Sequence, residues 1–237
     1  MTPKIVRNIA RADAPTIKAL GELGVATVHE AQRTIGETRT GLMRAYMRPI
    51  YATARVSGSA ITVLCPPGDN LTIHAAIEVC REGDILVVAI GEQTDQEYGM
   101  FGDLLATSCR ARGVAGLVID AGIRDIAELA RMEFPVWSKT VSARGTVKAA
   151  VGSVNLPIEC AGAEVNPGDV IVGDADGVVV VKRDTAAEVA KAAGQRRAKE
   201  ELTHRRLESG ELGIDIYRLR AKLTELGVEY VDIVDED

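Results

Sequence analysis

The sequence predicts an α/β fold, and three of its features carry that prediction. Segments with helical spacing of apolar residues alternate with short β-branched runs through the first half of the chain. Two of these runs, Ile85–Ile90 and Ala115–Asp120, are almost continuously apolar, as expected of strands covered on both faces. Hydrophobic residues make up 46% and charged residues 26% of the 237, so the chain can bury a sizeable core and is neither disordered nor collagen-like.

The first half divides into elements at its turn residues. Helical spacing and Gly24 split residues 14–34 into two short helices. The β-branched run Ser59–Leu64 predicts a strand, which ends in the turn Pro66–Asp69. The elements expected after this turn are a helix over Asn70–Cys80, a strand over Ile85–Ile90, a helix over Asp103–Arg112, a strand over Ala115–Asp120 and a helix over Arg124–Met132.

The second half changes character. Residues 143–182 are rich in Val, Gly and Thr and contain frequent turns, so they are expected to be mostly β. One long helix is expected over 184–209, followed by an arm over 214–234. Nothing marks a domain boundary, so we expect residues 1–237 to form one domain. Because apolar positions are sparse in the tail 184–237, this helix and arm are predicted to pack on a neighbouring subunit.

Charge and composition exclude several classes of function. A net charge of −6 and an aromatic content of 3% are unfavourable for binding nucleic acid, which needs a basic field or stacking platforms. The apolar runs are far shorter than the roughly 20 residues of a membrane helix. The four cysteines form no CxxC pair and the N-terminus has no apolar export segment, so we expect a cytoplasmic location. A small-molecule enzyme or a protein-binding module remains.

The clearest chemistry lies at the start of the helix expected at Asp103. Gly102 precedes this helix, and the free N–H groups of its first turn, at Leu104 and Leu105, are a ready site for a carboxylate or a phosphate. Asp103 itself has two interpretations. It is either a helix cap or an acid that takes part in a reaction.

Arg124 and Asp125 follow the next strand, at the edge of the sheet where α/β folds collect ligands. They are either a cap with a surface ion pair or part of a site. Because the two strand-to-helix corners belong to consecutive units, both can face one pocket. Arg124 would then bind a substrate carboxylate through its planar fork. Asp125 and Asp103 would offer hard oxygen ligands to a divalent cation such as Mg²⁺.

The spacing of these residues resembles a known signature. Asp103, followed after twenty residues by Arg124-Asp125, is similar to the D-x20-R-D motif of class II pyruvate aldolases that cleave 4-hydroxy-4-methyl-2-oxoglutarate and 4-carboxy-4-hydroxy-2-oxoadipate. They belong to the superfamily named after the regulator of ribonuclease E activity. The resemblance extends over nearly the whole chain, through the blocks VATVHEAQ (Val25–Gln32), MRPIYATA (Met47–Ala54), TVLCPPGDN (Thr62–Asn70), FPVWSK (Phe134–Lys139), GSVNLPIECAG (Gly152–Gly162) and SGELGIDIYRLR (Ser209–Arg220).

The resemblance implies roles for these residues. Asp125 would bind the divalent metal, and Arg124 with the backbone of Gly102–Leu105 would hold the pyruvyl carboxylate. Asp103 would position a water that acts as acid and base. The fold would be a compact α/β/β/α sandwich, and the subunits would form trimers that stack into hexamers. An acid from a neighbour's C-terminal helix would complete the site, with Glu200 the best match and the adjacent Glu201 the second choice.

The expected reaction is a retro-aldol cleavage in aromatic-acid catabolism. It leaves a pyruvate enolate, whose charge either a Schiff-base lysine or a metal can absorb. We expect no lysine beside the proposed pocket, since Lys139 and Lys148 lie downstream in the β half, so the metal route is favoured, with Mg²⁺, Mn²⁺ or Co²⁺. Because loss of CO₂ from oxaloacetate gives the same enolate, oxaloacetate decarboxylase activity is expected beside it.

Three further residues and one alternative function complete the predictions. Asn70 either begins its helix or contacts the substrate. His29 is a helix histidine or reaches a substrate from a neighbouring subunit, and His74 is expected in the core or an interface. The alternative function is a non-catalytic regulator that binds a ribonuclease. The acid at position 125, directly after the arginine, favours the aldolase.

Overall fold

The computed structural model describes residues 3–37, 40–91 and 97–232. The chain divides into two units, Met1–Gly194 and Gln195–Asp237. Every strand of the described residues lies in the first unit, and the helix α6 (Ala186–Glu208) begins in the first unit and ends in the second. The second unit continues with two short helices, α7 (Gly213–Ile216) and α8 (Arg220–Glu225). Among the described residues, no helix is long and apolar enough to cross a bilayer.

Four parallel strands form the part of the sheet that carries the candidate site. Their order across the sheet is β3 (Val56–Cys65), β4 (Ile85–Ile90), β6 (Gly116–Ile123) and β7 (Val136–Val141). The strand β4 and the first four residues of β6 are continuously apolar and almost completely buried, which is the pattern of strands covered on both faces. Because the strands are parallel, the loops after β3, β4 and β6 all leave from one edge of the sheet.

Antiparallel strands extend this sheet on both sides. The first part of β3 pairs with β11 (Val170–Asp174), and its last part pairs with β4, so one long strand belongs to both halves of a curled sheet. The remaining strands are β1 (Gly41–Leu42), β2 (Arg48–Pro49), β5 (Gly99–Phe101), β8 (Ser153–Val154), β9 (Ile158–Cys160), β10 (Ala163–Val165) and β12 (Gly177–Val181). Of these, β9 and β10 form a separate two-stranded sheet.

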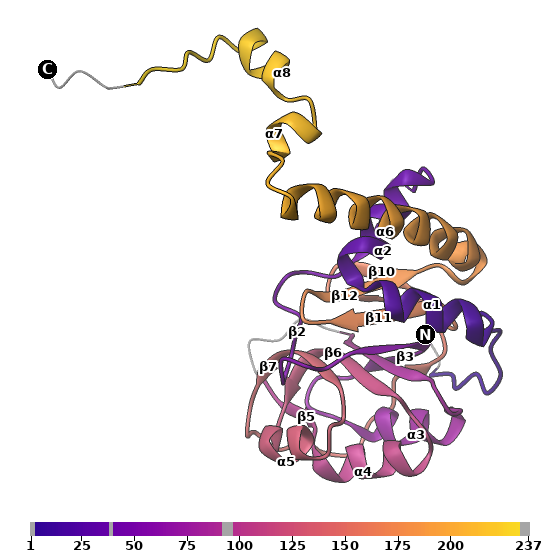
Figure 1. Ribbon diagram of the computed structural model, residues 1–237. Helices are drawn as coiled ribbons and strands as arrows, with labels where there is room; N and C mark the ends of the chain where they lie inside the picture. The colour runs from indigo at the N-terminus through magenta and orange to yellow at the C-terminus, as the bar shows by residue number, and fades with distance from the viewer. Residues whose placement is uncertain (1–2, 38–39, 92–96, 233–237) are drawn as a thin grey trace, which may run out of the picture. The chain divides into compact units, whose positions relative to one another are not determined.

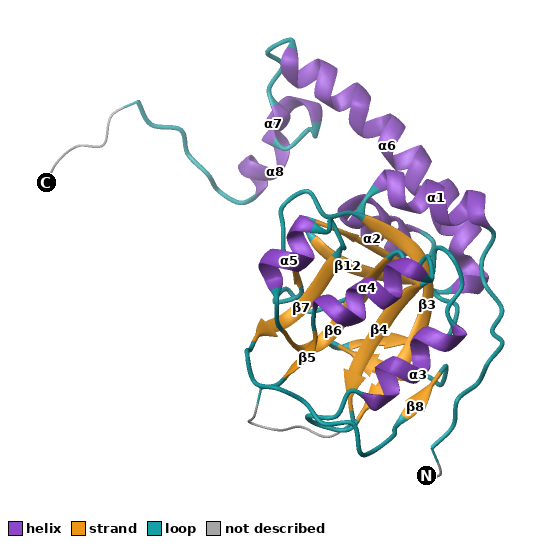
Figure 2. Cartoon of the chain, turned by 90° about the horizontal axis from the view of Figure 1, so that it is seen from below, coloured by secondary structure: helices purple, strands orange, loops and turns teal. Residues whose placement is uncertain are grey.

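Three apolar clusters separate four layers. The helices α1 (Ala14–Leu23) and α2 (Val25–Thr34), with the start of α6, pack on the outer face of β11 and β12. The helices α3 (Leu71–Val79), α4 (Asp103–Ala111) and α5 (Ile126–Arg131) cover the outer face of the parallel strands, as Figures 1 and 2 show. A third cluster, centred on Trp137, lies between the two halves of the sheet. The first unit is therefore the expected α/β/β/α sandwich.

The predicted elements of the first half are present, with a shift at one of the two functional corners. The helix expected from Arg124 begins at Ile126, because Asp125 has a left-handed backbone with φ of 58°. The helix expected at Asp103 does begin there, but its N-cap is Gly102.

The prediction of a mostly β segment is wrong at its start. Residues 143–152 contain no strand, only an isolated bridge between Val147 and Asp69. The side chain of Asp69 binds this segment, so it has no regular ladder.

A buried ion pair anchors the turn that leads into β4. Asp84 is 1% exposed and accepts hydrogen bonds from Arg11 Nε at 2.8 Å and Arg11 Nη2 at 2.7 Å. Its Oδ2 also accepts the backbone N–H of Arg81 at 2.7 Å. This arrangement ties the N-terminal segment to the start of a central strand. The pair raises the pKa of Arg11 through the hydrogen bond to Asp84, so the guanidinium stays charged.

We predict that Arg11→Ala lowers the free energy of unfolding by about 3–5 kcal/mol, because it leaves the Asp84 carboxylate buried without its partner. Urea unfolding followed by circular dichroism measures the change. Arg7→Ala, at an exposed position of the same segment, is the control and should stay within about 0.5 kcal/mol of the wild type. Equal midpoints for the two variants would contradict the prediction.

Candidate active site

The pairing of β5 with the end of β6 brings the two predicted corners together. Gly99 is opposite Gly122 and Phe101 is opposite Ile123, so the residues that follow each strand are neighbours. The backbone N–H of Arg124 donates to the carbonyl oxygen of Phe101 at 2.9 Å, which fixes the second corner against the first. The expectation that both corners share one place in the fold is therefore met by backbone pairing.

The carboxylate of Asp125 lies against the start of α4. Its Oδ2 accepts the backbone N–H of Asp103 at 3.3 Å and lies 3.4 Å from Nε of Arg124. The left-handed backbone of Asp125 turns the side chain back toward this helix end, in a conformation that residues with a Cβ rarely adopt. Among the described residues, no group donates a hydrogen bond to Oδ1 of Asp125, and its side chain is 35% exposed. One oxygen of the carboxylate therefore remains available.

Gly102 makes this contact sterically possible. A Cβ at this position would lie 2.3 Å from Oδ2 of Asp125 and 3.1 Å from Cγ of Arg124. Its φ of −153° is ordinary extended backbone, so the requirement is for space and not for an unusual conformation. Any larger residue at position 102 has to displace the carboxylate.

The start of α4 offers one open backbone donor. The N–H of Leu104 donates to Oδ1 of Asp103 at 2.8 Å, so the Asp103 side chain occupies one of the two groups that were expected to bind an anion. Among the described residues, the N–H of Leu105 has no acceptor. The positive end of the helix dipole adds to this site. The helix end thus has the predicted character, with Asp103 as a side-chain cap.

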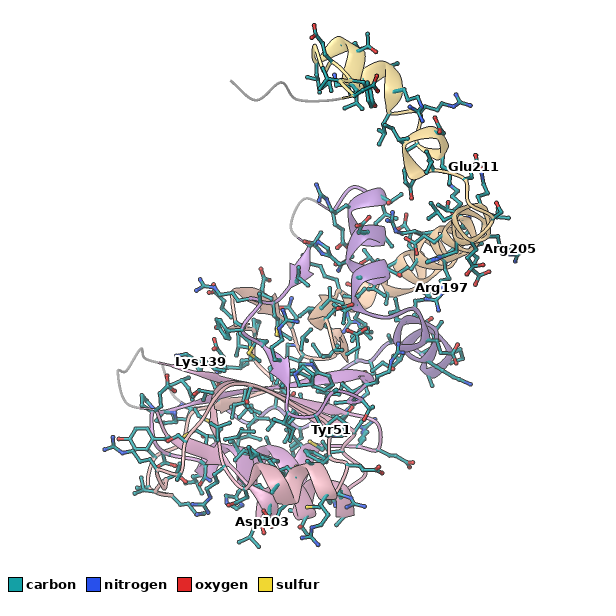
Figure 3. All side chains as sticks on the ribbon, turned by 60° about the vertical axis from the view of Figure 1, so that its left-hand side comes forward. Tyr51, Asp103, Lys139, Arg197, Arg205 and Glu211 are labelled. Carbon is teal, nitrogen blue, oxygen red and sulfur yellow. The ribbon has the colours of Figure 1, made fainter. Side chains whose placement is uncertain are left out.

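A cavity of about 130 Å³ lies at this junction, and the residues that the sequence assigned to substrate binding line it. They are Asn70, Gly102, Asp103, Leu104, Leu105 and Arg124. Asp125 lies behind Gly102, in contact with the cavity wall through Arg124 and the N–H of Asp103. In Figure 3, the labelled Asp103 projects from the helix layer of the first unit.

Four further residues line the cavity, Gly99, Met100, Lys148 and His74, and the last two bear on the sequence analysis. Lys148 lies in the wall, although the sequence analysis placed no lysine at the pocket. His74 also lines the cavity and is exposed, so it does not lie in the core, and the interface alternative stays a prediction. Burial lowers the pKa of His74 and the nearby Lys148 lowers it further, so the imidazole is neutral at pH 7.

Lys139 lines a different cavity, of about 350 Å³, and pairs with Glu97 at 3.2 Å. Figure 3 shows Lys139 well apart from Asp103.

Asn70 contributes a buried acceptor to the wall. It is 7% exposed, and its Nδ2 donates to the carbonyl oxygen of Met100 at 3.1 Å. Because that carbonyl can only accept, the amide orientation is fixed and Oδ1 must be the other atom. Among the described residues, Oδ1 has no hydrogen-bond partner. A buried acceptor of this kind is satisfied by a ligand hydroxyl or a water.

Asp69 fixes the segment that carries Lys148. It is 3% exposed and accepts the N–H groups of Leu71, Ala149 and Ala150 at 2.9, 2.6 and 2.7 Å. Burial alone would raise the pKa of Asp69, but these N–H groups and the charge of Lys148 together hold it below its ordinary value. The exposed segment 143–152 is thereby held against the start of α3.

The acids in this region fit a cation that needs few protein ligands. Among the described residues, no group of three or more His, Cys, Asp or Glu side chains is arranged to hold a metal. Asp125 offers one open carboxylate oxygen, with Asp103 close by. Mg²⁺ keeps several waters and is commonly held by only one or two carboxylates, so this donor set suits it.

The two predicted acids of the C-terminal helix lie in the second unit. Glu200 pairs with Arg196 at 2.8 Å, and Glu201 lies 4.0 Å from Arg197. Both pairs are one helical turn apart along α6, as surface pairs usually are. The role of either acid in a neighbouring subunit's site stays a prediction.

Comparison with known proteins adds a family. A family model described as RraA-like (Aldolase/RraA) matches residues 25–180. A protein of Halalkalibacterium halodurans, named "Putative 4-hydroxy-4-methyl-2-oxoglutarate aldolase", is 32% identical over 171 residues, which cover 72% of this chain and 80% of that protein.

Two solved structures share the fold. Streptomyces coelicolor RraAS2, described as an unusual member of the RNase ES inhibitor RraA protein family, has a TM-score of 0.72 at 25% identity, over 83% of this chain and 99% of that one. An uncharacterized protein from Pseudomonas syringae pv. tomato has a TM-score of 0.72 at 24% identity, over 86% of this chain and 97% of that one. The α/β/β/α arrangement is therefore common to both.

We predict that Asp69→Asn lowers the free energy of unfolding by about 1–3 kcal/mol at pH 7, because a carboxamide cannot accept all three N–H groups. Since the folded-state pKa of Asp69 is lowered, the advantage of the wild type is complete above the unfolded-state pKa of about 3.9 and disappears as the pH falls through the folded-state value.

Urea unfolding of both proteins between pH 7 and pH 2.5 measures this difference. Asp176→Asn, an exposed aspartate, is the control and should change the unfolding free energy little at any pH. A stability difference for Asp69→Asn that grew on acidification would show that the sign is wrong.

Proposed function

This chain belongs to the RraA-like family, and from this premise we propose that it is a divalent-metal-dependent pyruvate aldolase. Its substrates would be 4-hydroxy-4-methyl-2-oxoglutarate, cleaved to two pyruvates, and 4-carboxy-4-hydroxy-2-oxoadipate, cleaved to pyruvate and oxaloacetate. The observation that carries this proposal is the junction itself. The guanidinium of Arg124 and the open helix N–H of Leu105 belong to one cavity wall, and the carboxylate of Asp125, with one available oxygen, lies 3.4 Å from Nε of Arg124.

The binding of the pyruvyl end follows from this geometry. Arg124 would hold the substrate carboxylate through its planar fork, and the N–H of Leu105 would donate to the same group. Asn70 Oδ1 would accept the hydrogen bond of the substrate hydroxyl, which satisfies an acceptor that is otherwise buried without a partner. These contacts orient the bond between C3 and C4 before it breaks.

The proton transfers fall to Asp103. Acting through a water, its carboxylate would take the proton of the C4 hydroxyl, so that a carbonyl forms at C4 while the C3–C4 bond breaks. The electron pair of that bond moves onto the pyruvyl half as an enolate. Returning the proton to C3 gives pyruvate. Asp103 ends in its starting state, so the cycle is balanced.

Asp125 would hold the metal, with Glu200 of a neighbouring subunit acting through water. A bound Mg²⁺, Mn²⁺ or Co²⁺ would supply a Lewis acid that stabilises the negative charge developing on the 2-oxo oxygen. Because the same charge develops when oxaloacetate loses CO₂, oxaloacetate decarboxylase activity belongs to the proposal. Cleavage of these acids in the cytoplasm would place the enzyme in aromatic-acid catabolism.

We further propose that the site is completed in a trimer or a hexamer. Three large apolar side chains in the segments around the cavity are exposed: Leu104 by 76%, Val147 by 61% and Ile126 by 42%. Exposed apolar side chains that gather around a functional site commonly mark a surface that a partner covers. A second copy of the chain would cover these residues and bring its own C-terminal helix to the site.

Because Lys148 lies at the cavity, a Schiff base on a lysine is again an alternative to a metal for absorbing the charge of the enolate. The sequence analysis favoured a metal because no lysine was expected at the pocket, and that premise is wrong. Support for the metal now rests on the open carboxylate of Asp125 at the junction. A ribonuclease regulator is the other alternative, because one structural neighbour is described as an RNase ES inhibitor relative.

We predict that EDTA abolishes pyruvate formation from 4-hydroxy-4-methyl-2-oxoglutarate and that Mg²⁺, Mn²⁺ or Co²⁺ restores it. Asp125→Asn should lower kcat by about 100-fold or more even with added metal, because several kcal/mol of charge stabilisation are lost. A coupled lactate dehydrogenase assay measures the rates, and Glu128→Gln, an exposed acid one turn along α5, is the control.

The same assay separates the alternatives. Activity that survives EDTA, together with inactivation by borohydride in the presence of pyruvate and a matching mass gain on Lys148, would establish the Schiff-base route instead. Absence of any cleavage, with binding to a ribonuclease, would support the regulator.

We predict that Gly102→Ala lowers kcat/KM by about 100-fold while the unfolding midpoint changes little, because the new Cβ displaces the Asp125 carboxylate by roughly 1 Å or more without straining the backbone. Gly145→Ala is the matched control, since its Cβ would meet no atom within 4 Å. If both variants keep wild-type kinetics, the position of the Asp125 carboxylate does not matter for the reaction.

A further inference from the structure

We propose that Lys148 binds a second carboxylate of the substrate and thereby makes the site selective for dicarboxylic over monocarboxylic 2-oxo acids. The proposal rests on the aldolase function proposed above and adds a residue that the sequence analysis placed outside the pocket. Lys148 and Arg124 are the lysine and the arginine among the residues that line the cavity.

The two cations differ in their counter-charges. Arg124 has a carboxylate beside it, since Oδ2 of Asp125 lies 3.4 Å from its Nε. Within the described part of the chain, Lys148 forms no ion pair. The charge of Lys148 helps to lower the pKa of Asp69, but that carboxylate already accepts three backbone N–H groups. A cation that faces a cavity without a counter-charge is a binding site for an anionic group of the ligand.

The position of Lys148 is fixed although its side chain is exposed. On one side, the N–H of Val147 donates to the carbonyl oxygen of Gly68 at 2.9 Å, and its own carbonyl accepts the N–H of Asn70 at 3.1 Å. On the other side, the N–H groups of Ala149 and Ala150 donate to Asp69. The backbone is thus tied to the loop before α3 on both sides of Lys148. Such preorganisation lowers the entropic cost of binding a ligand.

The other polar groups in this cavity wall are less suited than Lys148 to binding a second carboxylate. His74 is neutral at pH 7, because burial and the charge of Lys148 lower its pKa. Asn70 offers an acceptor, which suits a hydroxyl and not a carboxylate. Among the described residues that line the cavity, Lys148 is therefore the cation left for the second carboxylate of a dicarboxylic 2-oxo acid whose pyruvyl end lies on Arg124 and Leu105.

The experiment compares two substrates that differ in one group. 4-Hydroxy-4-methyl-2-oxoglutarate carries the second carboxylate, and 4-hydroxy-4-methyl-2-oxopentanoate has a methyl group in its place and cleaves to pyruvate and acetone. Lys148→Met keeps the length of the side chain and removes the charge. We expect kcat/KM for the dicarboxylate to fall by about 10- to 100-fold, mainly through KM, and kcat/KM for the monocarboxylate to change less than about threefold.

Two further variants serve as controls. Lys148→Arg keeps a positive charge and should retain most of the preference for the dicarboxylate. Lys139→Met removes a lysine that lines the neighbouring cavity and should leave both substrates unaffected. An equal fall for both substrates in Lys148→Met, or a loss of preference in Lys139→Met, would overturn the proposal.

Exchange of the pyruvate C3 protons with deuterium, followed by proton NMR, separates this proposal from the one on which it rests. It needs only the pyruvyl half of the site and should be unchanged in Lys148→Met. If the wild-type protein shows neither exchange nor cleavage, the aldolase function fails. If the wild type shows exchange and Lys148→Met abolishes it, Lys148 acts on the pyruvyl half and the selectivity proposal fails.

Discussion

The site depends on one contact, between the carboxylate of Asp125 and the backbone N–H of Asp103. This contact joins two strand-to-helix corners that lie far apart along the chain. It exists because β5 pairs with the last residues of β6 and because Gly102 leaves room for the carboxylate. The guanidinium of Arg124 and the open N–H of Leu105 take their relative positions from the same junction. Without the contact, the backbone pairing would still bring the two corners together, but the carboxylate of Asp125 would not be held against the start of α4.

The layered fold supplies the rigidity that such a junction needs. The strands that end at the site are buried on both faces, by α3, α4 and α5 on one side and by the Trp137 cluster between the sheet halves on the other. The long strand β3 belongs to both halves of the sheet, so movement of one half is transmitted to the other. Close packing of this kind limits how far the backbone at the site can shift. The chemistry is thus placed on loops whose ends are held by the core.

Sequence patterns predicted what is local and missed what is long-range. The alternation of helices and strands and the two corners follow from periodicity and spacing, so they could be predicted. Lys148 could not be placed, because its position results from the Asp69 side chain binding Ala149 and Ala150, which no periodic pattern encodes. The left-handed conformation of Asp125 was missed as well, since such a residue looks like an ordinary helix start in the sequence. The available signal was the sequence of residues 143–152, which lacks the alternation of a strand.

Because the N–H of Leu104 donates to Oδ1 of Asp103, this side chain competes with any bound anion for that backbone donor. Any incoming anion that occupies both amides of this helix end has to exchange with that carboxylate. The affinity for a small anion is therefore reduced by the internal bond, which discriminates against weakly held inorganic ions.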